Sequence, residues 1–275
     1  RMLDAFCERH GKKPFALMEQ KIVRQFRDEK VAAGTPEAAN NLVKTLRAVF
    51  AWAVEAEEAQ HNPAKGVPKI NTGSSGFYTW TEKEVFQFMD YHPIGTKARK
   101  ALSIMLLTGV RPSDAIRLGP QHERPGDTDA SNGLLSFTEY KNRKRKPKHR
   151  TIPILPELRQ VLDATPSGHL TYLVTEFGKP YASAKAFGNW FKRQCVMAGL
   201  PMCTAHGLRK AGATIAAQNG IPAHALMAIY GWSTLKQAET YTHAVNEQKL
   251  AEAHMHSNVP ERKVGRSVPL LPAVT

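Results

Sequence analysis

The residues best suited to chemistry are cations and one tyrosine in four short segments. The first segment reads Thr-Gly-Val-Arg-Pro at positions 108–112. Gly109 is a typical end of a helix, and Pro112 suits the first turn of the next one. Arg111 is then expected at a helix N-terminus, where free N–H groups favour an anion and the planar guanidinium group fits phosphate oxygens. An ordinary turn between two helices is the alternative for this segment alone.

The second segment, residues 140–150, has seven Lys or Arg residues among eleven and no acidic residue. Short strands are expected on either side of it, at 134–140 and 151–154. A basic hairpin of this kind is suited to lie along a DNA backbone, although a solvated charge run or a nuclear-localisation-like patch has the same composition. The side chains expected to bind DNA are Arg143, Lys144, Arg145, Lys146, Lys148 and Arg150.

The last two segments lie in the C-terminal part of the chain. His206 and Arg209 are three residues apart, so on a helix they would share one face and place a proton acceptor beside a fixed cation. Gly231-Trp232 is followed nine residues later by Tyr241, within Tyr-Thr-His. The pairing of His206 with Arg209 could be a surface coincidence. A single tyrosine such as Tyr241 is far more often a core residue than a nucleophile.

Taken in order, the four segments resemble the conserved boxes of the tyrosine recombinase, or phage integrase, family over residues 80 to about 250. Each box alone is weak, whereas the ordered set is specific. The resemblance implies a DNA-cutting and DNA-joining enzyme. It assigns catalytic roles to Arg111, Lys141, His206, Arg209, Trp232 and Tyr241, and it makes Asp114 a residue that braces an active-site side chain.

The mechanism implied by the resemblance is attack of Tyr241 on a phosphodiester, which gives a 3′-phosphotyrosyl link and a free 5′-hydroxyl. His206 would act as the general base, the two arginines would hold the non-bridging oxygens, and Lys141 would protonate the leaving oxygen. No cofactor or metal is expected, since the sequence shows no carboxylate cluster suited to two magnesium ions. The resemblance also implies a homotetramer on two double-stranded DNA sites, with residues 245–256 as the element that docks on a neighbour.

Two features depart from the usual family pattern. Trp232 stands where most members have histidine, and an indole N–H can donate to a phosphate oxygen but cannot shuttle protons. The hairpin also contains Lys144, Lys146 and Lys148 as rivals to Lys141 for the role of general acid.

Composition agrees with an anionic partner. The chain has 38 Lys and Arg against 24 Asp and Glu, a net charge of +14, which favours nucleic acid or an anionic membrane surface. The three cysteines are irregularly spaced, which favours a reducing cytoplasm over a disulfide framework. No apolar run has the length of a membrane span and no signal peptide is recognised. The chain begins at Arg1, which leaves open whether a further N-terminal module exists.

The expected fold is mainly α with a small β-sheet or hairpin, in two domains. Residues 1–70 are predicted to form a helical DNA-binding domain that resembles the family's core-binding domain. A linker is expected at 71–79, because 71–76 reads Asn-Thr-Gly-Ser-Ser-Gly. A mixed catalytic domain is expected at 80–257, opening on the capping box Thr81 to Glu84, and a tail at 258–275.

Two other functions fit parts of the same pattern. A type IB topoisomerase-like or telomere-resolving enzyme uses the same phosphotyrosine step, but the short two-domain layout favours a recombinase. An inactive DNA-binding accessory protein could keep the fold, but the residue set for catalysis is complete. The DNA target, and the choice between integration, excision, resolution and inversion, cannot be deduced from the sequence.

Overall fold

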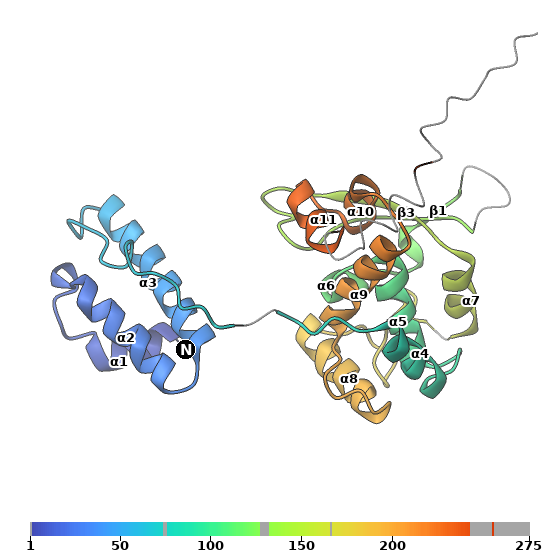
Figure 1. Ribbon diagram of the computed structural model, residues 1–275, viewed down its shortest axis with the longest axis horizontal. Coiled ribbons are helices and arrows are strands. Elements are labelled where there is room, and N and C mark those ends of the chain that lie inside the picture. The colour runs from blue at the N-terminus through green and yellow to red at the C-terminus, as the bar shows by residue number, and fades with distance from the viewer. Residues whose placement is uncertain (1, 74–75, 127–131, 166, 243–254, 256–275) are drawn as a thin grey trace, which may run out of the picture. The chain divides into compact units, whose positions relative to one another are not determined.

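The computed structural model describes residues 2–73, 76–126, 132–165, 167–242 and 255 (Figure 1). The chain forms two compact units that divide between Gly76 and Phe77. This division lies in the segment 71–79 where a linker is expected, but residues 77–79 belong to the second unit. The tail at 258–275 and the segment 245–256, apart from Met255, lie outside the described residues.

The first unit is helical, with α1 (Met2–His10), a short 3₁₀ helix (Phe15–Leu17), α2 (Gln20–Ala32) and α3 (Pro36–Glu55). Helices α2 and α3 pack through a core that includes Val23, Leu46 and Phe50. The chain after α3 returns along the same helix. The side chain of Asn40 exchanges two hydrogen bonds of 2.9 Å with the backbone of Ile70.

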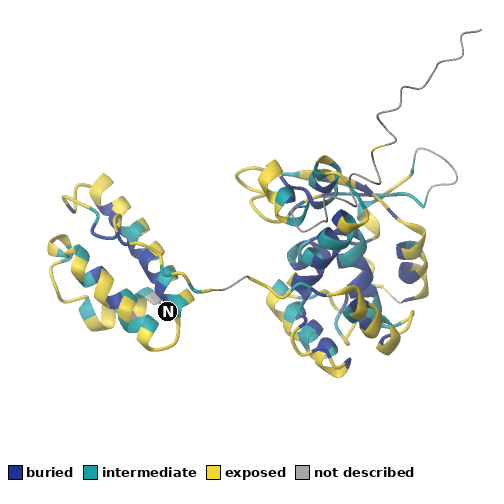
Figure 2. Cartoon of the chain, viewed as in Figure 1, coloured by how far each residue is buried: buried dark blue, intermediate teal, exposed yellow. Residues whose placement is uncertain are grey.

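The second unit is built around α5 (Lys97–Thr108), which is buried on most of its surface (Figure 2). Helix α5 contacts α9 (Ala205–Gln218), α7 (Pro156–Ala164), α8 (Ala184–Met197) and the single turn α6 (Pro112–Ala115). The remaining helices are α4 (Glu82–Tyr91), α10 (Ala223–Tyr230) and α11 (Leu235–Thr242), with a 3₁₀ turn at Pro120–His122. Thr81 and Glu84 form the expected capping box at the start of α4.

A three-stranded antiparallel sheet completes the second unit, in the order β1 (Glu123–Arg124), β2 (Leu134–Thr138) and β3 (His149–Pro153). The sequence predicts β2 and β3, with small differences in their ends, and misses the two-residue β1. Leu135 pairs with Ile152, and Phe137 pairs with Arg150. The expected core positions of the hairpin are all buried, namely Leu135, Phe137, Ile152 and Ile154.

No helix in the described ranges is both long and apolar enough to cross a lipid bilayer.

Candidate active site

Arg111 follows the turn that joins α5 to α6. Gly109 ends α5 in the left-handed conformation with φ 59°, and Arg111 is the N-cap of α6. Because α6 has only four residues, its dipole contributes less to anion binding than the sequence suggests. The structural partner of Arg111 is a carboxylate, since its Nη1 donates to Oε2 of Glu139 at 2.7 Å. The side chain of Arg111 remains 27% exposed and can still reach an external anion.

Two further arginines join the C-terminal ends of α5 and α10. Arg150 donates to the carbonyl oxygens of Thr108, at 2.9 Å, and Ile229. Arg209 donates to the next carbonyl oxygen of each helix end, those of Gly109 and Tyr230. Terminal helix carbonyl groups lack partners within the helix and carry partial negative charge, so they are good acceptors for guanidinium groups.

The two arginines thus hold the turn before Arg111 against the turn before Trp232. Burial, followed by the neighbouring charges of Arg111 and Arg150, lowers the pKa of Arg209 to about 10. Arg209 therefore stays protonated at neutral pH. The three guanidinium groups form one cationic cluster.

The expectation that Arg150 binds DNA is wrong. Burial in β3 alternates, and Arg150 lies on the same inward face as Ile152, with 4% of its surface exposed. The sequence predicts that β3 starts at residue 151, which leaves Arg150 in the loop. The strand starts at His149 instead, and the two-residue period of a strand turns Arg150 into the core.

Glu139 and Asp114 are the buried carboxyl groups of this cluster. Glu139 lies 2.7 Å from Arg111 and 3.5 Å from Arg150. Asp114 accepts a hydrogen bond of 2.7 Å from the backbone N–H of Tyr140, and its burial raises its pKa. Asp114 therefore fixes the chain directly before Lys141. Three arginines face two carboxyl groups, so the cluster keeps a net positive charge.

Sequence reasoning missed Glu139. The signal that could have found it is its position, because it directly precedes an eleven-residue stretch without any acidic residue. A single carboxylate beside so many cations is expected to be a counterion when it is buried.

Lys141 lines a cleft of about 360 Å³ next to the cationic cluster. Arg111 and Glu139 form part of the same cleft, and the loop after α10 contributes Gly231 and Ser233. Lys146 and Lys148 also line it, and Lys148 contacts the hydroxyl of Ser233 at 3.4 Å. Lys144 is exposed and is not among the lining residues. The structure therefore leaves Lys146 and Lys148 as rivals to Lys141.

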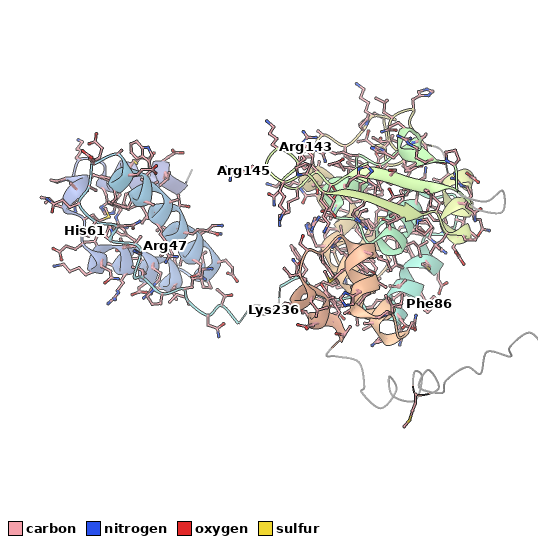
Figure 3. The ribbon with its side chains drawn as sticks, turned by 90° about the horizontal axis from the view of Figure 1, so that it is seen from above. Arg47, His61, Phe86, Arg143, Arg145 and Lys236 are labelled. Carbon is pink, nitrogen blue, oxygen red and sulfur yellow. The ribbon has the colours of Figure 1, made fainter. Side chains whose placement is uncertain are left out.

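The rest of the basic hairpin faces solvent. Arg143 and Arg145 project from the loop between β2 and β3 (Figure 3). Arg143 also lies 4.4 Å from the centre of the Tyr140 ring, and Arg117 lies 3.7 Å from the same ring. Cation–π contacts of this kind stiffen the base of the hairpin. Arg117, which sequence reasoning missed, is therefore part of the hairpin's support.

Tyr241 stacks on Trp232 at the end of α11. Their ring centroids are 5.0 Å apart with 6° between the planes, and Trp232 stacks in turn on Tyr230 at 5.0 Å. Arg209 lies 5.8 Å from the centre of the Trp232 ring. Burial raises the pKa of Tyr241, and the charge of Arg209 opposes this effect. The phenol is thus protonated at neutral pH and lies within the field of the cationic cluster.

His206 is the second residue of α9, whose N-cap is Thr204. Its ring stacks on Phe77, with centroids 4.4 Å apart and 15° between the planes. Partial desolvation of the ring lowers the pKa of His206, while the residue as a whole remains exposed to solvent. His206 and Arg209 both lie on α9, three residues apart, while their contacts differ: the ring of His206 meets Phe77, and Arg209 donates to Gly109 and Tyr230.

Within the described ranges, no group of three or more His, Cys, Asp or Glu side chains is placed to hold a metal ion.

Arg111 and Lys141 thus line one cleft, and the phenol of Tyr241 stacks on Trp232 within the field of Arg209. Transfer of a phosphoryl group to a tyrosine requires groups of these kinds, namely a phenol, fixed cations and a proton donor. The model of the phage integrase family matches residues 79–248. The chain belongs to the phage integrase family of tyrosine-type site-specific DNA recombinases. No curated protein sequence matches the chain.

Solved structures share the fold at low sequence identity. A lambda integrase dimer bound to a COC′ core site has a TM-score of 0.71 and 16% identity, covering 98% of this chain and 89% of that chain. The Tn1549 transposon integrase in complex with transposon right end DNA has a TM-score of 0.70 and 19% identity, covering 93% and 91%. A lambda integrase tetramer bound to a Holliday junction has a TM-score of 0.66 and 17% identity, covering 85% and 69%.

Proposed function

We propose that this recombinase cleaves DNA by attack of the Tyr241 phenol on a phosphodiester, which leaves a 3′-phosphotyrosyl bond and a free 5′-hydroxyl. The observation that carries the proposal is the pair of bridges made by Arg150 and Arg209, which brings the segment of Arg111 next to the segment of Trp232 and Tyr241. The phosphotyrosyl bond conserves the energy of the phosphodiester, so a second 5′-hydroxyl can reverse the step without ATP.

Each side chain has a role that its surroundings support. Arg111 and Arg209 stabilise the charge that develops on the non-bridging oxygens. Trp232 supports the tyrosine ring and can donate its indole N–H to the phosphate. His206, whose pKa is lowered by partial desolvation of its ring, accepts the phenol proton once DNA brings the groups together. Lys141 lines the same cleft as Arg111 and donates a proton to the leaving 5′-oxygen.

Arg111 is paired with Glu139. A DNA phosphate that enters the cleft therefore meets a guanidinium group that already has one carboxylate partner, and it must share that group with Glu139 or displace it. The exposed cations at the tip of the hairpin, Arg143, Lys144 and Arg145, bind the phosphates of the DNA backbone by charge and do not read the base sequence.

The assembly is proposed to be a homotetramer on two double-stranded DNA sites, as in the lambda integrase tetramer on a Holliday junction. The helical first unit is proposed to bind the same DNA as the second. The enzyme is proposed to act in the cytoplasm, where its free thiols Cys7, Cys195 and Cys203 remain reduced.

The proposal is tested by trapping the intermediate on nicked suicide duplexes that carry a randomised region. The wild-type chain should form a protein–DNA adduct that resists denaturant, in buffer with excess EDTA, and sequencing the trapped DNA should reveal the target. Tyr241→Phe should form no adduct yet bind the recovered DNA within a few-fold of wild type. An adduct in the Phe variant would contradict the assignment, and no adduct from wild type on any duplex would favour an inactive DNA-binding protein.

A further inference from the structure

The segment that enters the second unit from the linker is fastened to the first turn of α9. The indole N–H of Trp80 donates to the carbonyl oxygen of Thr204 at 3.0 Å. The amine of Lys210 donates to the carbonyl oxygen of Phe77 at 2.9 Å. Between these two bonds, the ring of Phe77 stacks on the ring of His206. Three separate contacts thus hold residues 77–80 against the start of the helix that carries His206 and Arg209.

Gly207 makes this close approach possible. A Cβ atom at position 207 would lie 2.2 Å from the carbonyl oxygen of Tyr78 and 2.8 Å from the Trp80 ring. Both neighbours are held in place, because backbone and a buried indole cannot move aside cheaply. Residues 78–80 can therefore lie against α9 only because position 207 is a glycine.

The ring of Phe77 is not part of the hydrophobic core. It is a large apolar side chain with 52% of its surface exposed, at the point where the chain enters the second unit. A ring in that position gains little from core packing. Its one ring contact in the described structure is with the imidazole that the proposed mechanism uses as a base.

We propose that Phe77 is a positioning residue for the reaction: its ring fixes the orientation of the His206 imidazole and shields one of its faces from water. The inference rests on the proposed function, in which His206 accepts the phenol proton. It ties the base to the end of the interdomain linker, so a displacement of residues 77–80 would release His206.

His206 as a residue is exposed to solvent, so the stacked Phe77 ring covers only part of its imidazole. Partial desolvation of the ring is the cause of its lowered pKa. No charged group among the described residues contributes to the shift, and the charged side chains next to residues 77–80 and to His206 on α9 are bound elsewhere. On α9, Arg209 bonds Gly109 and Tyr230, and Lys210 bonds Phe77. On α4, Glu84 accepts from Tyr78 and Thr81. A shielded imidazole stays neutral to lower pH, and a neutral imidazole is the form that accepts a proton.

The first test is the titration of His206 by NMR in the full chain without DNA, with the signal assigned by its loss in His206→Gln. Phe77→Ala should raise the pKa of His206 by about half a unit or more, because the imidazole becomes better solvated. Phe77→Tyr keeps the ring and should preserve the wild-type titration. Phe86→Ala is the matched control, since Phe86 is exposed on α4 and lies at the outer surface of its unit (Figure 3). It should change nothing.

A second pair of variants moves the linker without touching Phe77. Gly207→Ala should displace residues 77–80 and raise the pKa of His206 in the same direction as Phe77→Ala. Gly188→Ala, in α8, is its control because a Cβ there meets no atom within 4 Å. An unchanged His206 titration in both Phe77→Ala and Gly207→Ala would overturn the inference.

The link to the reaction is tested by the pH dependence of single-turnover cleavage of a trapped suicide duplex. Activity needs neutral His206, so the acidic limb of the profile should move to higher pH by the shift measured by NMR, with DNA affinity unchanged. A shifted His206 pKa with an unmoved acidic limb would overturn the positioning role, while adduct formation through Tyr241 would leave the proposed function standing. Failure of wild type to form any adduct would remove the proposed function and this inference together.

Discussion

The rings of Trp232 and Tyr241 lie parallel, with centroids 5.0 Å apart and 6° between their planes. Trp232 stands where most family members have a histidine, and it is 8% exposed. A histidine could donate to the phosphate as an indole can, but it offers a smaller face for stacking. In this protein Trp232 therefore has a packing role against Tyr241 that is visible without DNA.

This packing predicts a measurable coupling. Trp232→Ala should destabilise the second unit by about 3–5 kcal/mol because it leaves a cavity in a buried cluster. A double-mutant cycle with Tyr241→Ala should show a coupling energy of about 0.5–1.5 kcal/mol from the aromatic pair. Urea unfolding of the full chain, followed by near-UV circular dichroism, measures both. Strictly additive effects would show that the stacking contributes no stability, and Tyr241→Phe, which keeps the ring, serves as the control.

The general acid can be identified with a modified substrate. Lys141→Ala should slow cleavage of an ordinary phosphodiester far more than cleavage of one with a 5′-bridging sulfur, because a thiolate leaves without a proton. Rate measurements on the two substrates give the comparison. Lys144→Ala is the control, since Lys144 does not line the cleft. Equal slowing of both substrates by Lys141→Ala would transfer the role to Lys146 or Lys148.

The turn after α10 depends on the absence of a side chain. Gly231 has φ 62°, and a Cβ there would lie 2.5 Å from Oε1 of Glu139 and 2.8 Å from Cδ of Arg150. Gly178 has a similar φ of 71° but meets no atom within 4 Å. Both Gly→Ala changes cost about 1–2 kcal/mol from the left-handed backbone.

Gly231→Ala should therefore be more destabilising than Gly178→Ala by about 1–3 kcal/mol, from overpacking beside the cationic cluster. It should also slow cleavage, because it separates the segments of Arg111 and Tyr241. Denaturant unfolding and single-turnover rates measure the two effects. Equal stability of the two variants would contradict the described packing of Gly231 against Glu139.

The hairpin tip should bind phosphates without reading sequence. Changing Lys144 and Arg145 to Gln should weaken binding to target and non-target DNA equally. It should also make the slope of log K against log salt shallower by about two, one unit per lost contact. The control replaces Lys185 and Arg193, one lysine and one arginine exposed on α8, at the end of the unit away from the sheet (Figure 1). A lost preference for target DNA with an unchanged salt slope would mean that these side chains contact base edges.

A buried lysine away from the active site should make stability depend on pH. The amine of Lys100 donates to the carbonyl oxygens of Thr165 and Tyr172 and to the hydroxyl of Ser167. Burial lowers its pKa to about 8 from an ordinary value of 10.5. Between these two values the unfolded chain binds more protons than the folded one, so the free energy of unfolding should rise with pH, by up to about 1.4 kcal/mol per unit.

Urea unfolding from pH 7 to 9.5 measures this dependence. Lys100→Met should remove the rise above pH 8, whereas Lys97→Met, on the same helix, should retain it. An identical pH dependence in wild type and Lys100→Met would show that Lys100 does not titrate in this range.

The sequence determines the local features of this protein. Glycine and proline signals place the helix ends at Gly109 and Gly231, and the structure confirms both. Alternating apolar residues predict the β2–β3 hairpin and its core positions. The ordered boxes predict the family. These features depend on interactions within a few residues, which a pattern of residue types records directly.

The tertiary structure decides what each cation does. Arg145 and Arg150 belong to the same basic run, yet Arg145 faces solvent while Arg150 is buried against Thr108 and Ile229. A shift of the strand start by two residues decides between these fates, and strand ends are set by pairing with a distant segment and not by local propensity.

The same reason applies to the pairing of Arg111 with Glu139 and to the stacking of Phe77 on His206. Each pair joins residues far apart in the chain, and charge or ring type alone does not select the partner. Only the tertiary arrangement of α5, α9, α10 and β3 brings the ends of two helices to Arg150 and Arg209. The sequence thus predicts the candidate catalytic groups from local motifs, while their orientation is a property of the folded unit.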